Sequence, residues 1–416
     1  MIIKSRLNNF VLRKTAKPQI EMKQAILLLA TLFFVCLEGY AQKFFVQASA
    51  SQTLGARAQI DSLLAEFGEN FDSQKYTLPI SFAVSVGKTV QMTAITYRTQ
   101  DPLGNEILAS GLVAYPVKGA LRGTVEVAPY SKEKGLCGSK RLYTLETLPS
   151  ILGYVVLVPD TIGYGISEDE VIPLLLSRNT AQVSADMRQA VREYFRSVGE
   201  KRALPSETSL FGYSLGASGT LALACHYTAH PELGVKLEQI YMGGGAYDPG
   251  LSLRGTLQRG ENGFLLFPAI AQSLNRWRGL GLNPAQLFTG EVLRDFDYIA
   301  SCRENPADMA QRYGTDVHTY LHPDCFREGH NEDLLRLMKE LDNLVVPGPG
   351  EDFPHTVPVY IRHSAQDTFV PVECSDRLVR KLKEVGHHSV LYRRDRSGTH
   401  YETAARSFMD LILMLL

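Results

Sequence analysis

Apolar and polar positions along residues 84–158 predict a series of short strands. Residues 90–97 alternate between apolar and polar side chains, and residues 107–115 return after a turn that contains Pro and Gly, as expected for an antiparallel pair. Two further strands are predicted at residues 124–128 and 154–158. The second of these is a continuous apolar run, Tyr-Val-Val-Leu-Val, which is typical of a buried parallel strand.

Further along the chain, strands alternate with helices except in one long segment. Residues 183–194 place apolar side chains at helical spacing, and apolar strands follow at 209–213 and 239–244. The alternation stops between residues 251 and 354, where the sequence is mostly helical in pattern and rich in Gly and Pro. It resumes with four predicted elements: a strand at 357–362, a helix at 372–385, a strand at 389–392 and a helix at 401–416.

This order of elements predicts an α/β fold, in which a mainly parallel sheet is covered by helices on both faces. The antiparallel pair would form its leading edge. We expect the first part of the core at residues 42–248, a mostly helical inserted cap at residues 249–355, and the second part of the core at residues 356–416. A chain of 416 residues accommodates one large α/β domain with such an insertion.

The N-terminal residues 1–41 have the layout of a secretory signal. An apolar run, Ala25–Leu37, follows a basic start at Met22 and ends shortly before the small residue Ala41. We expect cleavage after Ala41 and initiation at Met22, so that residues 1–21 would be an over-long start. Because the run is too short for a comfortable membrane span, the sequence predicts an exported protein, periplasmic or extracellular, without stable membrane insertion.

Net charge and cysteine content bear on binding partners and on disulfides. The formal net charge is −1 at pH 7, so the chain lacks the basic character of a nucleic-acid-binding protein. Five cysteines remain after removal of the signal, which contains Cys36, and export would permit disulfides. Of these five, Cys302 and Cys325 are near neighbours and are the favoured pair. The sequence leaves the oligomeric state open.

The most informative motif is Gly212-Tyr213-Ser214-Leu215-Gly216, which ends a short apolar run and opens an alanine-rich helical segment. A Gly-x-Ser-x-Gly sequence between a strand and a helix predicts a nucleophile elbow, a tight turn that presents the serine at the carboxyl end of the sheet. The two glycines allow the strand and the helix to approach each other closely. Ser214 is therefore the candidate nucleophile, and the N–H of Leu215 at the helix N-terminus is the candidate first oxyanion donor.

A serine needs a base within hydrogen-bond reach, and the base needs a third group to hold it. After a nucleophile elbow, the acid and then the histidine are expected just beyond late strands. Asp367 follows the predicted strand 357–362, and His400 follows the predicted strand 389–392. His387 and His388 precede their strand and so fall at the wrong end of the sheet. We therefore take Asp367 and His400 as the partners of Ser214.

With these residues in place, the chain resembles the α/β-hydrolase superfamily over roughly residues 80–416. The elbow Gly212–Ala217, the turn Pro159–Gly165 and the loop Asp367–Pro371 are most similar to secreted lipases and esterases, including the fungal secretory lipases. The resemblance implies the α/β-hydrolase fold with an inserted cap, hydrolysis of carboxylic esters through an acyl-enzyme, and no cofactor.

The chain departs from many members of the superfamily at the second oxyanion donor. They carry His-Gly after the strand that ends here at Ala128, whereas this chain has Pro129-Tyr130-Ser131. Three donors stay open on the sequence: the backbone N–H of Tyr130, the backbone N–H of Ser131, and the Tyr130 hydroxyl, as in some prolyl peptidases of this fold.

Two other groups of residues are candidates for a substrate pocket and for a metal site. Phe264, Phe267 and Trp277 form an apolar patch that either lines an acyl pocket or packs the core of the insertion. His226 and His230 have the spacing of metal ligands on one helix, but no third ligand accompanies them. We therefore expect no metal site.

The sequence thus predicts an exported serine hydrolase that cleaves an ester of a small molecule, a lipid or a carbohydrate. Ser214 would attack the carbonyl, His400 would carry the proton, and Asp367 would orient His400. One alternative is a serine peptidase of the same fold that cleaves short peptides; the Gly216-Ala217 pair favours the esterase, by resemblance alone. A second alternative is a non-catalytic binding protein on a hydrolase fold, which the filled Ser, Asp and His positions disfavour.

Overall fold

A computed structural model describes residues 43–67, 85, 87–131, 137–142 and 144–416. Residues 44–416 form one compact unit. The predicted signal peptide, residues 1–41, lies outside the described residues, so its cleavage stays a prediction. Among the described helices, none combines the length and the apolar character needed to cross a membrane.

The described residues form a nine-stranded sheet in the order β1-β2-β3-β5-β4-β6-β7-β8-β9. Three antiparallel strands lead it, and β3 is also antiparallel to β5, whereas all neighbours from β5 to β9 are parallel. The strands are β1 (Phe45–Leu54), β2 (Val90–Gln100), β3 (Glu106–Pro116), β4 (Thr124–Val127), β5 (Val155–Pro159), β6 (Glu207–Tyr213), β7 (Lys236–Gly243), β8 (Val359–Ser364) and β9 (Val390–Asp395). The mainly parallel α/β sheet predicted from the sequence is confirmed.

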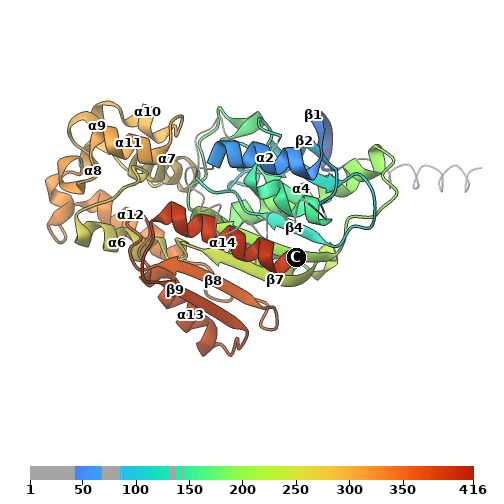
Figure 1. The fold of residues 1–416 in the computed structure, drawn as a ribbon. Coiled ribbons are helices and arrows are strands. Elements are labelled where there is room, and N and C mark those ends of the chain that lie inside the picture. Colours follow the sequence, from blue (N-terminus) through green and yellow to red (C-terminus); the bar gives the residue numbers. More distant parts are fainter. Residues whose placement is uncertain (1–42, 68–84, 86, 132–136, 143) are drawn as a thin grey trace, which may run out of the picture. The chain divides into compact units, whose positions relative to one another are not determined.

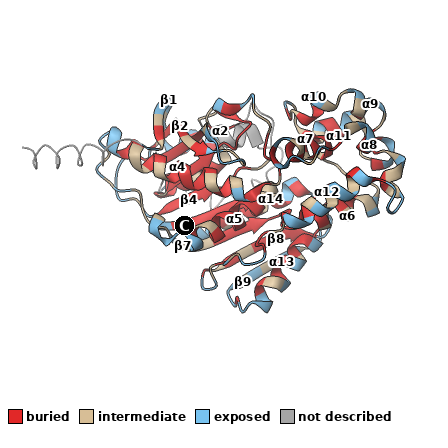
Figure 2. Cartoon of the chain, turned by 180° about the vertical axis from the view of Figure 1, so that it is seen from behind, coloured by how far each residue is buried: buried red, intermediate tan, exposed pale blue. Residues whose placement is uncertain are grey.

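Helices cover both faces of the sheet (Figure 1). One apolar core joins the sheet to α4 (Ser177–Ser197), α5 (Leu215–Ala229) and α13 (Glu373–Glu384). Another core lies on the opposite face and joins it to α2 (Ala56–Phe67), the 3-10 helix η2 (Leu145–Leu152) and α14 (His400–Leu415). The central strands are buried on both faces (Figure 2), as expected for parallel strands sandwiched between helices.

Residues 249–355 separate β7 from β8 and are largely helical (Figure 1). The segment holds α6 (Pro249–Arg259), α7 (Phe267–Arg278), α8 (Pro284–Leu287), α9 (Gly290–Arg294), α10 (Phe296–Ala300), α11 (Pro306–Tyr313) and α12 (Glu332–Asn343). We call this segment the helical insertion. Its many prolines and glycines act as helix boundaries: α6, α8 and α11 begin at a proline, and α6 and α7 end at a left-handed glycine.

The predicted Cys302–Cys325 disulfide is absent from the structure, and this expectation was wrong. Cys325 is a free thiol that lies 3.8 Å from the carbonyl oxygen of Leu287 and accepts a hydrogen bond from Asn331 Nδ2 at 3.3 Å. Cys302 instead packs in a small apolar core with Cys137 and Ala269. The two thiols are close in sequence but belong to different apolar cores. Cys302 lies in the small core that contains Cys137, whereas Cys325 lies in the largest core.

Candidate active site

Ser214 stands at the junction between β6 and α5 in a strained backbone conformation, with φ 56° and ψ −125°. A residue with a Cβ rarely adopts positive φ, and such strain persists where surrounding structure enforces it. Here the N–H of Ser214 donates to the carbonyl oxygen of Gly243 on β7 at 2.9 Å. The structure therefore shows the tight strand-to-helix turn that the motif predicts.

The two motif glycines are required by close contacts. A Cβ on Gly212 would lie 2.2 Å from the carbonyl oxygen of Gly216 and 2.3 Å from Thr220 Oγ1. A Cβ on Gly216 would lie 2.6 Å from the carbonyl oxygen of Ala128 at the end of β4. Any side chain at either position would push α5 away from the sheet and move Ser214.

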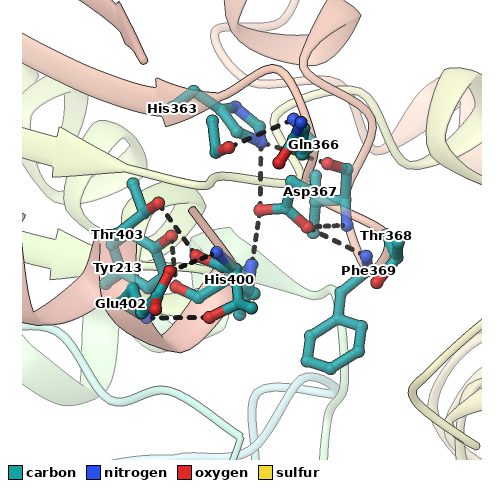
Figure 3. A network of polar contacts seen from close by, with 12 residues as sticks. Tyr213, His363, Gln366, Asp367, Thr368, Phe369, His400, Glu402 and Thr403 are labelled. Carbon is teal, nitrogen blue, oxygen red and sulfur yellow. Dashed lines mark hydrogen bonds and ion pairs between the residues drawn. The ribbon is translucent and has the colours of Figure 1, made fainter. Parts of the chain in front are cut away.

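Asp367 lies in the loop after β8, and its side chain is fully buried. Its Oδ1 accepts hydrogen bonds from the backbone N–H groups of Phe369 and Val370, both at 2.9 Å. Its Oδ2 lies 2.6 Å from His400 Nδ1 (Figure 3).

The environment keeps the Asp367 carboxyl ionised. Burial by itself would raise the pKa of Asp367, but the neighbouring His400 and the hydrogen bonds from His363 and His400 lower that pKa well below the usual range of a carboxyl. An ionised carboxylate can only accept, so His400 Nδ1 donates to it. Nε2 is then the nitrogen that carries the lone pair of the neutral ring.

His400 is the first residue of α14, and the start of that helix is firmly fixed. Thr399 caps it, and Glu402 completes a capping box with the Thr399 backbone. The carbonyl oxygen of His400 accepts from the Tyr213 hydroxyl at 2.8 Å (Figure 3). The imidazole packs between aromatic rings, 4.9 Å from Tyr213 and 5.1 Å from Phe369 between ring centroids. These contacts hold the ring in one orientation.

Ser214 and His400 line the same cavity, whose volume is about 90 Å³. Its walls are mostly apolar and come from both the sheet side and the helical insertion: Leu215, Ala246, Leu253, Phe264, Leu266, Phe267, Ile270, Leu341, Phe369 and Val370. Among the described residues that line it, His400 alone has an ionisable side chain. The cavity suits an uncharged, apolar group held beside the serine and the histidine.

Of the three residues predicted for the apolar patch, two line the cavity and one does not. Phe264 and Phe267 line the cavity. Trp277 is not among the lining residues; it is buried in the large core of the insertion, where its indole N–H donates to the carbonyl oxygen of Val171 at 3.0 Å. For Trp277 the structure favours core packing, one of the two alternatives that the sequence left open.

The candidate oxyanion donors also differ in whether they line the cavity. Leu215 is the first residue of α5 and lines the cavity. Ser131 lines it as well, and its buried hydroxyl oxygen has no hydrogen-bond partner in the described part of the chain. The Tyr130 hydroxyl donates to Glu146 Oε1 at 2.7 Å, and Tyr130 is not a lining residue. The tyrosine hydroxyl is thus occupied, whereas the hydroxyl of the lining residue Ser131 has no hydrogen-bond partner among the described residues.

Sequence reasoning did not single out Tyr213, Phe369 or His363, all of which contact the Asp367–His400 pair. Tyr213 and Phe369 adjoin predicted site residues, so proximity in sequence could have suggested them. His363 lies at the end of β8, four residues before Asp367, and its position in a strand end was the available signal. The rings of His226 and His230 are tilted against each other with their centroids 4.5 Å apart, and no described group of three or more potential metal ligands includes them.

Three features together define the α/β-hydrolase fold. The sheet begins with three antiparallel strands, and a serine in a strained conformation joins a strand to a helix. An aspartate and a histidine follow the last two strands. The fold class predicted from the sequence is therefore confirmed, and known structures agree with it.

The esterase LipA from Xanthomonas oryzae, described as rice cell wall degrading, matches with a TM-score of 0.70 at 18% identity, over 90% of this chain and 97% of that one. Candida antarctica lipase A matches with a TM-score of 0.58 at 14% identity, over 86% of this chain and 78% of that one. No family model and no curated protein matches the sequence. At these identities the likeness establishes the fold.

Proposed function

We propose that this protein is a serine hydrolase that cleaves carboxylic esters through an acyl-enzyme. The observation that carries the proposal is one arrangement: a strained serine and an aspartate-held histidine both line one apolar cavity. In the first step Ser214 Oγ attacks the ester carbonyl while His400 Nε2 takes its proton. His400 then gives that proton to the departing alcohol, and water repeats the sequence on the acyl-enzyme.

Asp367 serves this cycle by accepting from His400 Nδ1. The bond fixes the imidazole so that Nε2 is the nitrogen available to Ser214, and the negative charge stabilises the imidazolium that forms in each step. Because Asp367 is buried and ionised, it acts without taking the proton itself.

We propose Leu215 and Ser131 as the donors that stabilise the oxyanion. The backbone N–H of Leu215 is one of the unpaired donors at the N-terminus of α5 and directly follows the nucleophile. Ser131 is favoured over the Tyr130 hydroxyl for the second donor because Ser131 lines the cavity, while the Tyr130 hydroxyl binds Glu146. The backbone N–H groups of Ser131 and Tyr130 stay alternatives to the Ser131 hydroxyl.

The lining of the cavity supports an ester with an uncharged acyl group over a peptide. A peptidase that recognises a free terminus needs a buried group of opposite charge, and the lining residues that the structure describes offer no carboxylate, lysine or arginine. We propose that residues 249–355 act as a cap over the core formed by residues 42–248 and 356–416. Leu253, Ile270 and Leu341 of that segment would contact the acyl chain.

We further propose that the protein works outside the cytoplasm, in the periplasm or the extracellular space. The support is the signal-like pattern Ala25–Leu37 followed by Ala41. The described residues contain no membrane-spanning helix that would compete with this location.

The purified protein, assayed with p-nitrophenyl esters of increasing chain length and with aminoacyl-arylamides, tests the proposal. We expect turnover of the esters and none of the arylamides. Preferential cleavage of the arylamides would establish the peptidase instead. Reversible binding of the esters without turnover would favour the non-catalytic binding protein.

A further inference from the structure

His363 lies in β8, and its side chain is completely buried. Its Nδ1 is 2.7 Å from Ser375 Oγ, at the start of α13. Its Nε2 is 3.1 Å from the carbonyl oxygen of Val370 and 3.3 Å from Asp367 Oδ2 (Figure 3). The ring therefore bridges a strand, a helix and the loop that carries Asp367.

The partners of the His363 ring define its tautomer. A carbonyl oxygen can only accept, so the hydrogen of the neutral ring is on Nε2, where Val370 needs a donor. Nδ1 then carries the lone pair, and the Ser375 hydroxyl donates to it. In this tautomer the Nε2–H donates to the Val370 carbonyl, and Asp367 Oδ2 lies 3.3 Å from the same nitrogen.

Asp367 consequently receives donors from several directions. Two backbone N–H groups of its own loop bind Oδ1, His400 Nδ1 donates to Oδ2, and His363 Nε2 lies 3.3 Å from Oδ2. The loop donors can move together with the loop. His363 cannot, because its strand is paired with β7 on one side and β9 on the other. It is the contact that ties the carboxylate to the rigid sheet.

We propose that His363 is a positioning residue of the active site: its Nε2–H fixes the Asp367 carboxylate, and through that carboxylate the ring of His400. The proposal rests on the proposed function of Ser214, His400 and Asp367, and adds a fourth member to their network. His363 touches no reacting atom, so its contribution is the geometry of the pair. Misplacing a catalytic group by about 1 Å can cost about 10²-fold in rate.

Two substitutions at position 363 separate this role from packing. His363→Gln can place an amide N–H where Nε2 stands, whereas His363→Leu fills similar space without a donor. We expect His363→Leu to lower kcat about 10- to 100-fold with KM changed less than about 3-fold, and His363→Gln to recover most of that loss. Ser375→Ala removes the hydroxyl that holds Nδ1 and should lower kcat in the same direction by a smaller factor. Circular dichroism and thermal unfolding establish that each variant is folded.

A proton NMR signal gives a second readout that packing alone would not move. The hydrogen between His400 Nδ1 and Asp367 Oδ2 should resonate far downfield in the wild type and in His363→Gln, and should shift or broaden in His363→Leu and, less strongly, in Ser375→Ala. A folded His363→Leu variant with wild-type kcat and an unchanged signal would overturn the inference. If His363→Leu does not fold, an unchanged signal and kcat in Ser375→Ala overturn it.

The NMR signal reports the Asp367–His400 bond whether or not the protein cleaves esters. An inactive wild type whose signal responds to His363→Leu would therefore contradict the proposed function while supporting the positioning role of His363.

Discussion

At the scale of single residues, the sequence predicts which side chains meet where each follows a strand end. Each of Ser214, Asp367 and His400 follows a predicted strand, and the structure places Ser214 and His400 on one cavity with Asp367 bonded to His400. The direction of a side chain within a loop was beyond the sequence. Tyr130 points its hydroxyl at Glu146, and only tertiary packing decides that.

The unpartnered hydroxyl of Ser131 leads to a prediction about the oxyanion. Ser131→Ala should lower kcat by about 10²-fold, because losing one such donor typically costs that much, while KM changes little since the oxyanion exists only in the transition state. Tyr130→Phe is the matched control and should change kcat less than about 3-fold. Steady-state kinetics on one ester measures both. Wild-type kcat in Ser131→Ala would contradict a role for the Ser131 hydroxyl and leave the backbone N–H groups of Tyr130 and Ser131 as the candidates.

At the scale of secondary-structure elements, apolar periodicity predicted the elements that bury one face or both. It predicted β2 to β9 and the helices α4, α5, α13 and α14, because their apolar positions pack against neighbours. It gave no prediction for β1, whose residues Phe45–Leu54 are mostly exposed. An outer strand that pairs through its backbone on one side needs few apolar side chains, so its sequence carries no clear period.

A buried ion pair and a hydrogen bond connect α4, β4 and α5, the helix that follows Ser214. Arg188 on α4 binds Glu126 on β4, and the Tyr227 hydroxyl on α5 donates to the same carboxylate at 2.7 Å. Arg188→Met would leave the Glu126 charge buried without its cation, so we expect a loss of about 3–5 kcal/mol in the free energy of unfolding. Urea denaturation measures it.

The exposed pair Arg57–Asp61 on α2 supplies the control for that measurement. Arg57→Met should cost less than about 1 kcal/mol, because solvent screens exposed charges. Equal losses in Arg188→Met and Arg57→Met would show that the buried pair does not stabilise this part of the core.

At the scale of the whole molecule, the mainly parallel sheet followed from the alternation of strands and helices along the chain. The packing of the insertion did not. Its core contains Trp277 and Leu337 together with residues of α4 and β3 in one continuous cluster, and such long-range contacts leave no local signature. The failed Cys302–Cys325 pairing has the same cause.

The proposed cap leads to a prediction about chain length. Ile270 of α7 lines the cavity and is partly exposed, so Ile270→Trp should narrow the space for the acyl group. We expect kcat/KM for long-chain p-nitrophenyl esters to fall about 10-fold or more, while acetyl ester hydrolysis changes little. Leu335→Trp, on the exposed face of α12 in the same insertion, should leave the profile unchanged. An unaltered profile in folded Ile270→Trp would place chain-length selection outside the insertion.

Covalent labelling with a fluorophosphonate, followed by mass spectrometry of the labelled peptide, tests the central claim most directly. The label needs a serine activated by a base. We predict a single adduct on Ser214 in the wild type, its loss in Ser214→Ala, and labelling slowed by at least about 10²-fold in His400→Ala, where the general base is missing. An adduct on another residue, or undiminished labelling of Ser214→Ala, would contradict the assignment of Ser214 as the nucleophile.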